Sequence, residues 1–181
     1  MIRTAQFALC GMLFLAGCTG TVDLGDSSAV AGLMVDGVQT GTSTCNLPSN
    51  KDMVVSRLVE LINRERTSRG LHTLTLDSVL NEVADAYCCE MIGNDYFDHI
   101  NPFTHEGPGE RAIHGGYLFV AIGENLAGGQ HTPEQVVIDW MNSTKGHREN
   151  ILAAQWEELG VGVRTGGDYG VYWVVEFGNP P

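Results

Sequence analysis

Three side chains in the sequence are of the types that bind metal ions or transfer protons: His99, Glu124 and His147. They lie in the segments YFDHINPF, IGENLAGG and TKGHRENIL, which are short polar stretches between apolar residues. Glycines in two of these segments let backbone approach backbone, so side chains distant in sequence can meet. Two imidazoles and a carboxylate that converge can bind a divalent metal, with the carboxylate as a ligand or as the group that orients a ring. They can equally transfer protons near neutral pH.

The spacing of these residues is not by itself a metal-binding signature. No two of them are four residues apart, as the histidines of HExxH are, and histidines hydrogen-bonded in turns are the competing structural interpretation. Ser143 lies near His147 and suggests a serine nucleophile, but no GxSxG motif surrounds it and no third residue evidently orients the imidazole. The residues alone leave metal binding, proton transfer and a structural role open.

The charge balance of the chain excludes one class of partner. With 10 basic and 22 acidic residues, the formal net charge is −12. Such a surface repels phosphate backbones and anionic head groups, so we do not expect nucleic-acid binding. A solvated acidic surface otherwise says little about the substrate.

The N-terminus has the features of an export signal. Arg3 is followed by an apolar run and by LAGC, which resembles the bacterial lipobox, in which the cysteine is lipidated after cleavage. We therefore expect a lipoprotein signal peptide over 1–17, a lipid anchor on Cys18 and a flexible tether over 18–50, which is rich in Gly, Ser, Thr and Asp. Thr19 is not the aspartate that signals inner-membrane retention, so the outer membrane of a bacterial cell envelope is favoured. The domain is expected over 51–181.

Export to an oxidising compartment makes the remaining cysteines candidates for one disulfide. Cys88 and Cys89 are adjacent in a predicted helix, where neighbouring side chains diverge by about 100°, so they are poor partners for each other. Cys88 falls on the apolar side of that helix and Cys89 faces outward. This favours a bond between Cys45 and Cys89.

The elements that must position the polar residues follow from hydrophobic periodicity and capping signals. Asp77 is a suitable N-cap, and Thr132-Pro133-Glu134 has the N-cap, N1 proline and first-turn acid of a helix. The predicted helices span 52–69, 77–93, 110–113 and 132–142, and the predicted strands span 118–127, 159–164 and 170–177. Helices precede and interrupt a small antiparallel sheet, so the predicted class is α+β.

Several motifs occur in an order that resembles the CAP superfamily, the cysteine-rich secretory, antigen 5 and pathogenesis-related proteins, in its bacterial single-domain branch. They are LVELINRERTSRG, GERAIHGGY, IGENLAGG, TPEQVVIDWMNSTKGHRENIL, ELGVGV and YWVVEFG, and the likeness covers 52–177. The resemblance implies a three-layer α-β-α sandwich (SCP-like) with a central cleft that two histidines and two acids line. His99 matches the first histidine, Glu124 the acid of the GEN segment and His147 the second histidine.

One position departs from the family pattern. Many eukaryotic members carry the second acid three residues after the tryptophan of the fourth helix, where this chain has Ser143 after Trp140. Glu134 lies at the start of that helix and is not the replacement by alignment, while the sequence does not decide whether Glu149 points toward the cleft. Two imidazoles and one carboxylate leave open positions for water, so we expect zinc or another divalent cation to be held weakly at most.

The resemblance supports three functions. The favoured one is an envelope-anchored binding module whose cleft holds a small ligand, a lipid or a fragment of the cell wall. The first alternative is a protease-like hydrolase, dependent on metal or free of it, in which His99 and His147 hold a water molecule and Glu124 acts as the base. The second is a structural or adhesin role in which these residues only join helices to the sheet.

Overall fold

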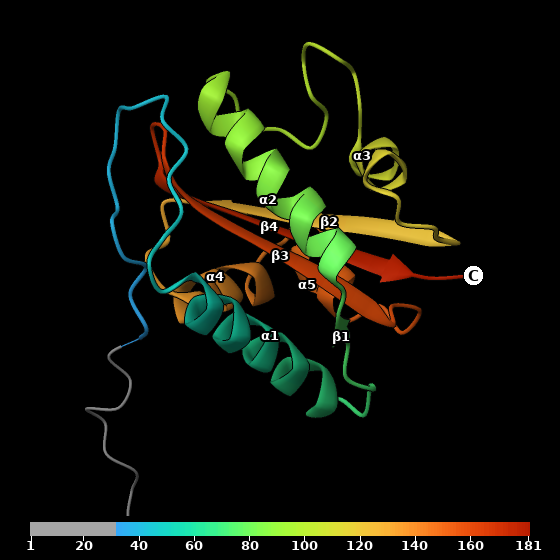
Figure 1. Ribbon diagram of the computed structural model, residues 1–181. Coiled ribbons are helices and arrows are strands. Elements are labelled where there is room, and N and C mark those ends of the chain that lie inside the picture. Colours follow the sequence, from blue (N-terminus) through green and yellow to red (C-terminus); the bar gives the residue numbers. More distant parts are fainter. Residues whose placement is uncertain (1–31) are drawn as a thin grey trace, which may run out of the picture. The chain divides into compact units, whose positions relative to one another are not determined.

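The computed structural model describes residues 32–181 (Figure 1). The predicted signal peptide, the predicted lipidation site Cys18 and the first part of the predicted tether lie outside the described residues. Within 32–181, every helix is too short or too polar to span a membrane.

The described chain contains five helices and four strands. The helices are α1 (Lys51–Thr67), α2 (Ser78–Gly93), α3 (Pro108–Gly115), α4 (Pro133–Met141) and α5 (His147–Ile151). The strands are β1 (Thr75–Leu76), β2 (Ala121–Gly128), β3 (Glu158–Gly166) and β4 (Gly170–Asn179). The predicted elements are confirmed, whereas α5 and β1 carry too few residues to show a periodic pattern and were not predicted.

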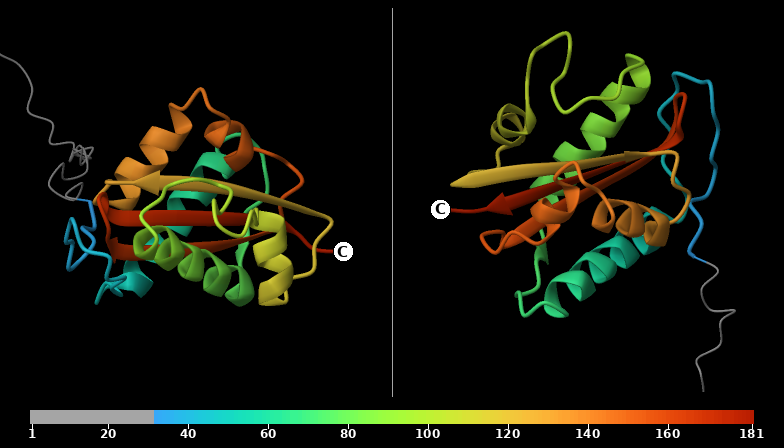
Figure 2. Two further views of the ribbon diagram at one scale, coloured as in Figure 1. Left: turned by 90° about the horizontal axis from the view of Figure 1, so that it is seen from above. Right: turned by 180° about the vertical axis from the view of Figure 1, so that it is seen from behind.

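The strands form one sheet in the order β1-β3-β4-β2, with β2 at one edge. The three longer strands pair antiparallel as predicted, but the two-residue β1 runs parallel to β3 and so departs from the all-antiparallel expectation. Helices α2 and α3 cover one face of the sheet, and α1, α4 and α5 cover the other (Figures 1 and 2). The predicted three-layer α-β-α sandwich is confirmed.

Capping side chains set the starts of two helices. The side chain of Asp77 accepts a hydrogen bond from the backbone N–H of Leu80 at the start of α2. At the start of α4, Thr132 accepts from the N–H of Gln135 and proline occupies the first turn. Each bond satisfies an N–H that has no partner within the helix, which explains why these boundaries can be recognised in the sequence.

Strand β4 separates two hydrophobic cores. Its residues Trp173, Val175 and Phe177 pack with α1 and α4, while Tyr172 and Val174 pack with α2 on the opposite face. This alternation follows from the two-residue period of a strand. Position 176 therefore projects toward the α2 and α3 layer, where the sequence places a glutamate.

Two glycines let α2 lie directly on β3. A Cβ atom at Gly160 would lie 2.1 Å from the carbonyl carbon of Leu80, and one at Gly162 would lie 2.4 Å from the carbonyl carbon of Ala84. No side chain fits at either position, because the backbone of the helix occupies that space. The GVG pattern of β3 thus sets the close contact of α2 with the sheet.

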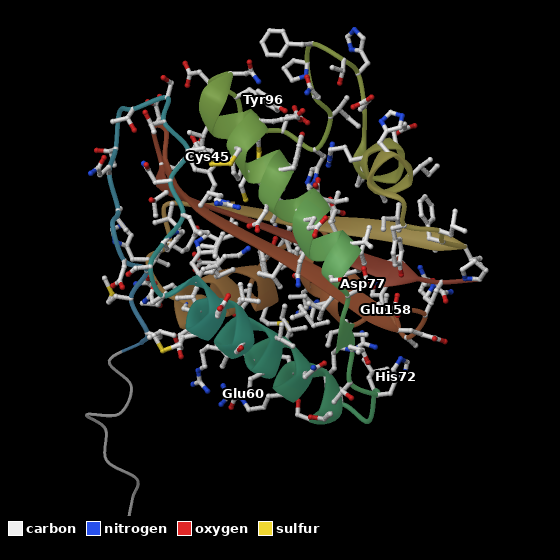
Figure 3. All side chains as sticks on the ribbon, in the orientation of Figure 1. Cys45, Glu60, His72, Asp77, Tyr96 and Glu158 are labelled. Carbon is white, nitrogen blue, oxygen red and sulfur yellow. A yellow bond between two sulfur atoms is a disulfide. The ribbon has the colours of Figure 1, made fainter. Side chains whose placement is uncertain are left out.

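Residues 32–50 do not form the predicted flexible tether. The backbone N–H of Val35 donates to His131, Asn46 pairs with Thr165, and Cys45 forms a disulfide with Cys89 of α2 (Figure 3). Cys88 is free and fully buried. The tether prediction is wrong for this segment because its partners lie far away in sequence, and the folded unit begins before residue 51.

Candidate functional site

A cleft of about 420 Å³ lies along the edge strand β2 and brings His99, Glu124 and His147 to one place. His99 comes from the segment between α2 and α3, Glu124 from β2, and His147 from the first position of α5. Because β2 is the edge strand, side chains from helical layers on both faces of the sheet can meet around it.

His99 and Glu124 form a direct pair. The Nδ1 atom of His99 lies 2.7 Å from Oε1 of Glu124, whose side chain is 1% exposed, whereas the imidazole is 48% exposed. This hydrogen bond raises the pKa of His99 above its ordinary value, because the carboxylate stabilises the imidazolium. It also leaves Nε2 as the ring nitrogen that remains for a ligand.

The second oxygen of Glu124 is held by Arg111, a residue that the sequence analysis did not select. The Nη2 atom of Arg111 lies 2.5 Å from Oε2 of Glu124, and its Nη1 donates to the carbonyl oxygens of His99 and Glu106. Its guanidinium lies 3.3 Å from the ring centroid of Tyr87, a cation–π contact. Arg111 thus fixes Glu124 and the backbone of His99 together. The GERAIHG segment signals only a short helix, so it did not distinguish this arginine from a surface residue.

A second buried carboxyl group lies behind Glu124. Glu176 is opposite Glu124 in the register of β4 with β2, is fully buried, and lies 3.8 Å from Nη2 of Arg111. Burial, and then the charge of Glu124, raise the pKa of Glu176 well above its ordinary value. The shift favours the protonated form of Glu176. It does not line the cleft and is not a substitute for the family's second acid.

His147 is positioned by the turn before it. Gly146 has a φ angle of 95°, in the left-handed region that favours glycine, and this conformation turns the chain into α5. The Nδ1 atom of His147 lies 3.0 Å from Oγ of Ser143, the residue that stands where many relatives have an acid. Burial, and then the nearby His99, lower the pKa of His147 below its ordinary value. The two imidazoles of the cleft are therefore shifted in opposite directions.

Amide side chains join α5 to β2 beneath the cleft. Asn125 donates to the carbonyl oxygen of His147, and Asn150 donates to the carbonyl oxygen of Glu124 and to Oδ1 of Asn125. The indole of Trp156 in turn donates to the carbonyl oxygen of Asn150. This network fixes the segment that carries His147 against β2, the strand that carries Glu124.

Glu134 and Glu149, the two other acidic residues considered from the sequence, lie in different parts of the structure. Glu134 forms an ion pair with Arg57 of α1 at 2.7 Å and ties α4 to α1. Glu149 lines the cleft, but its carboxylate is exposed and pairs with Arg148 at 3.2 Å. The structure therefore settles the direction of Glu149, which the sequence left undecided.

The donor set limits how a metal ion can be held. Within residues 32–181, no three His, Cys, Asp or Glu side chains form a group that could hold a metal ion. Both oxygens of Glu124 are engaged, one by His99 and one by Arg111. The available donors are the Nε2 atoms of His99 and His147, with Glu124 as the group that orients the first ring. Two imidazole nitrogens are fewer than the three protein ligands of a typical catalytic zinc site.

The sandwich and its cleft, built from two histidines and a glutamate at an edge strand, define an SCP-type domain. The model of the cysteine-rich secretory protein family, CAP, matches residues 59–177, and the chain belongs to this family. The resemblance seen in the sequence motifs is therefore confirmed.

Two relatives come from Bacillus subtilis (strain 168). The uncharacterised protein YkwD is 39% identical over 139 residues, which cover 77% of this chain and 52% of that protein. The uncharacterised membrane protein YlbC is 33% identical over 107 residues, which cover 59% of this chain and 30% of that protein. The chain thus spans about half of the first relative and less than a third of the second.

Solved structures share the fold. An extracellular protein containing an SCP domain from Bacillus anthracis is 30% identical with a TM-score of 0.62, over 75% of this chain and 45% of that one. An outer surface protein of Borrelia burgdorferi is 25% identical with a TM-score of 0.66, over 75% of this chain and 97% of that one.

Proposed function

We propose that this is an extracytoplasmic binding protein, anchored in the bacterial envelope through Cys18, whose cleft holds a small ligand derived from the cell wall. The signal-like N-terminus and LAGC support export and lipidation, with the outer membrane favoured by Thr19. The extracellular and outer-surface relatives are consistent with this location.

The observation that carries the proposal is the chemistry of the cleft wall. Most of its side chains donate or accept hydrogen bonds; they are His99, Glu124, Asn125, Lys145, His147, Glu149, Asn150 and Gln155. Ala153 and Trp156 supply apolar surface. Many polar side chains around two apolar ones suit a polar ligand with defined hydrogen-bonding groups better than a lipid tail. We therefore favour a cell-wall fragment over a lipid.

A weakly held zinc ion is compatible with this proposal. His99 and His147 would hold it through Nε2, and it would supply a Lewis acid at the floor of the cleft. The same Nε2 atom of His99, backed by the carboxylate of Glu124, supports the hydrolase alternative, because such a pair can accept a proton from water.

Calorimetric titration of the purified protein with muropeptides, with and without zinc, tests the proposal. The His99→Ala, His147→Ala double variant should lose at least tenfold in muropeptide affinity, since both rings line the cleft. His114→Ala is the matched control, because this histidine is 67% exposed and outside the cleft. Equal muropeptide affinity in the wild type, the double variant and His114→Ala would reject the cleft as the binding site.

Two further readouts separate the alternatives. Mass spectrometry of the muropeptides after incubation would reveal cleavage and so support the hydrolase. Membrane fractionation of wild type and Cys18→Ala tests the anchor, and a variant that remains in the membrane fraction would contradict it.

A further inference from the structure

A second hollow continues the cleft along β2. We call it the distal groove; it has a volume of about 430 Å³, shares Lys145 and His147 with the cleft, and includes Phe97 and Gln130 in its wall. Residues 124–125 of β2 line the cleft and residues 126–128 line the distal groove. At about 3.3 Å per strand residue, this stretch is about 13 Å long. The two hollows therefore adjoin each other along β2, and together they are longer than a single sugar ring.

Two partly exposed aromatic rings form a ledge at the distal end. Phe97 is 36% exposed and Tyr169 is 45% exposed, and their ring centroids lie 5.0 Å apart. Both rings lie against Gly128, where a Cβ atom would come within 2.9 Å of the Tyr169 ring and 3.3 Å of the Phe97 ring. The glycine on β2 thus makes room for an aromatic surface beside the groove.

The rest of the wall is polar and includes one acidic and one basic side chain, Asp139 and Lys145. Asn142 and Thr144 are exposed, line the distal groove, and make no side-chain hydrogen bond among residues 32–181. Gln130 is held in place because its amide donates to Asp139. Amide and hydroxyl groups facing an aromatic ledge suit a ligand with hydroxyl groups on its rim and an apolar ring face.

The edge of β2 is closed to an added peptide strand. The carbonyl oxygen of Glu124 accepts from the side chain of Asn150, and the carbonyl oxygen of Leu126 accepts from the indole of Trp140. Strand addition depends on free main-chain groups along the edge, and here side chains occupy two of them. The groove therefore favours a ligand that contacts side chains over one that pairs with the backbone.

We propose that the combined groove binds a linear, uncharged glycan of at least two rings. One ring lies on the ledge of Phe97 and Tyr169, and the next lies in the cleft beside His147. The net charge of −12 disfavours a polyanionic glycan. This inference rests on the proposed function, because it names the ligand class of the same site and extends the site beyond the cleft.

Titration of the purified protein with N-acetylglucosamine oligomers of one, two and four rings tests the inference. Calorimetry gives the affinities, and the tryptophan fluorescence, to which Trp140 in the distal groove and Trp156 in the cleft contribute, reports occupancy. The four-ring oligomer should bind at least tenfold more tightly than the single sugar. Phe97→Ala and Tyr169→Ala should each weaken the two-ring and four-ring oligomers about tenfold and leave the single sugar within about threefold.

Two further variants show whether weaker binding is caused by the lost contacts or by unfolding. Phe103→Ala removes an aromatic ring that is 68% exposed and outside both hollows, and it should bind all oligomers as wild type does. The Asn142→Ala, Thr144→Ala double variant changes only exposed side chains and should also weaken the four-ring oligomer.

The outcomes separate this inference from the proposed function. Absence of a length preference, or unchanged affinity in the ledge variants, overturns the glycan groove even if muropeptides still need His99 and His147. Binding of four-ring oligomers that needs Phe97 and Tyr169 but neither histidine keeps the distal groove and rejects the cleft as the binding site. Binding of an extended peptide in place of every oligomer also overturns the inference.

Discussion

Glu124 and Glu176 lie directly opposite each other on β2 and β4, and both carboxyl groups are buried. Arg111 lies 2.5 Å from an oxygen of Glu124 and 3.8 Å from an oxygen of Glu176. Burial, and then the charge of Glu124, raise the pKa of Glu176 and favour its protonated form. Of the two carboxyl groups, Glu124 is the one that contacts both Arg111 and His99.

Removal of Arg111 should destabilise the fold strongly. Arg111→Ala leaves the Glu124 carboxylate buried without its cation, and such a change costs about 3–5 kcal/mol of unfolding free energy. We expect Glu176 to be protonated, so Glu176→Gln, which introduces a neutral group of the same shape, should change the unfolding free energy by less than about 1 kcal/mol. Urea denaturation measures both. If Glu176→Gln is as damaging as Arg111→Ala, Glu176 is ionised and the charge assignment is wrong.

The two cleft histidines should titrate in separate steps. As pH rises, His147 should lose its proton first, because burial lowers its pKa, and His99 should lose its proton later, because Glu124 raises its pKa. The His99–Glu124 pair therefore adds stability that is fully present below about pH 6.5 and is lost as pH rises through the folded pKa of His99. Histidine NMR shifts in the presence of a chelator measure both steps.

A matched pair of variants identifies the cause of the His99 shift. Glu124→Gln should lower the pKa of His99 toward its ordinary value. Glu149→Gln should leave it unchanged, because Glu149 lines the same cleft without contacting His99. An equal response to both variants would point to general cleft charge instead of the direct hydrogen bond.

The Cys45–Cys89 disulfide should hold residues 32–50 on the domain. The bond closes a loop with a sequence separation of 44, which corresponds to about 4 kcal/mol of unfolding free energy in the chain-entropy model. The Cys45→Ser, Cys89→Ser variant should lose about 2–4 kcal/mol and show faster amide exchange at Val35 and Asn46. Cys88→Ala, which removes the buried free thiol, should leave amide exchange in this segment slow. Unchanged exchange in the double variant would show that the segment is held without the bond.

The glycines of β3 should be intolerant of any side chain. Gly162→Ala places a Cβ atom against the backbone of Ala84, and relief requires α2 to move away from the sheet. We expect a loss of about 3 kcal/mol or more in unfolding free energy. Gly93→Ala is the control, since nothing lies within 4 Å of its Cβ position, and it should be neutral or stabilising by about 0.5–1 kcal/mol. A similar melting temperature for both variants would contradict the close helix–sheet contact.

Local physics explains how much of the fold could be predicted from the sequence. Helix starts at Asp77 and Thr132 depend on a hydrogen bond to an N–H three residues further on, so the signal lies within a few letters of sequence. Strand β4 could likewise be predicted, because its side chains alternate between the two faces of the sheet within one short segment. Of the cleft residues, His99, Glu124 and His147 could be selected because their motifs match a family, not because their spacing indicates a site.

The positions of the charged groups around the cleft could be found only from the tertiary structure. Arg111 in the sequence is one cation in a short helix, and only packing places it 2.5 Å from Glu124 and over the ring of Tyr87. Glu176 became a buried neighbour of Glu124 through strand register, which no local pattern specifies. Residues 32–50 were misassigned for the same reason, since their contacts join distant residues. Sequence determined the elements and the family, whereas long-range packing decided which charges share one buried space.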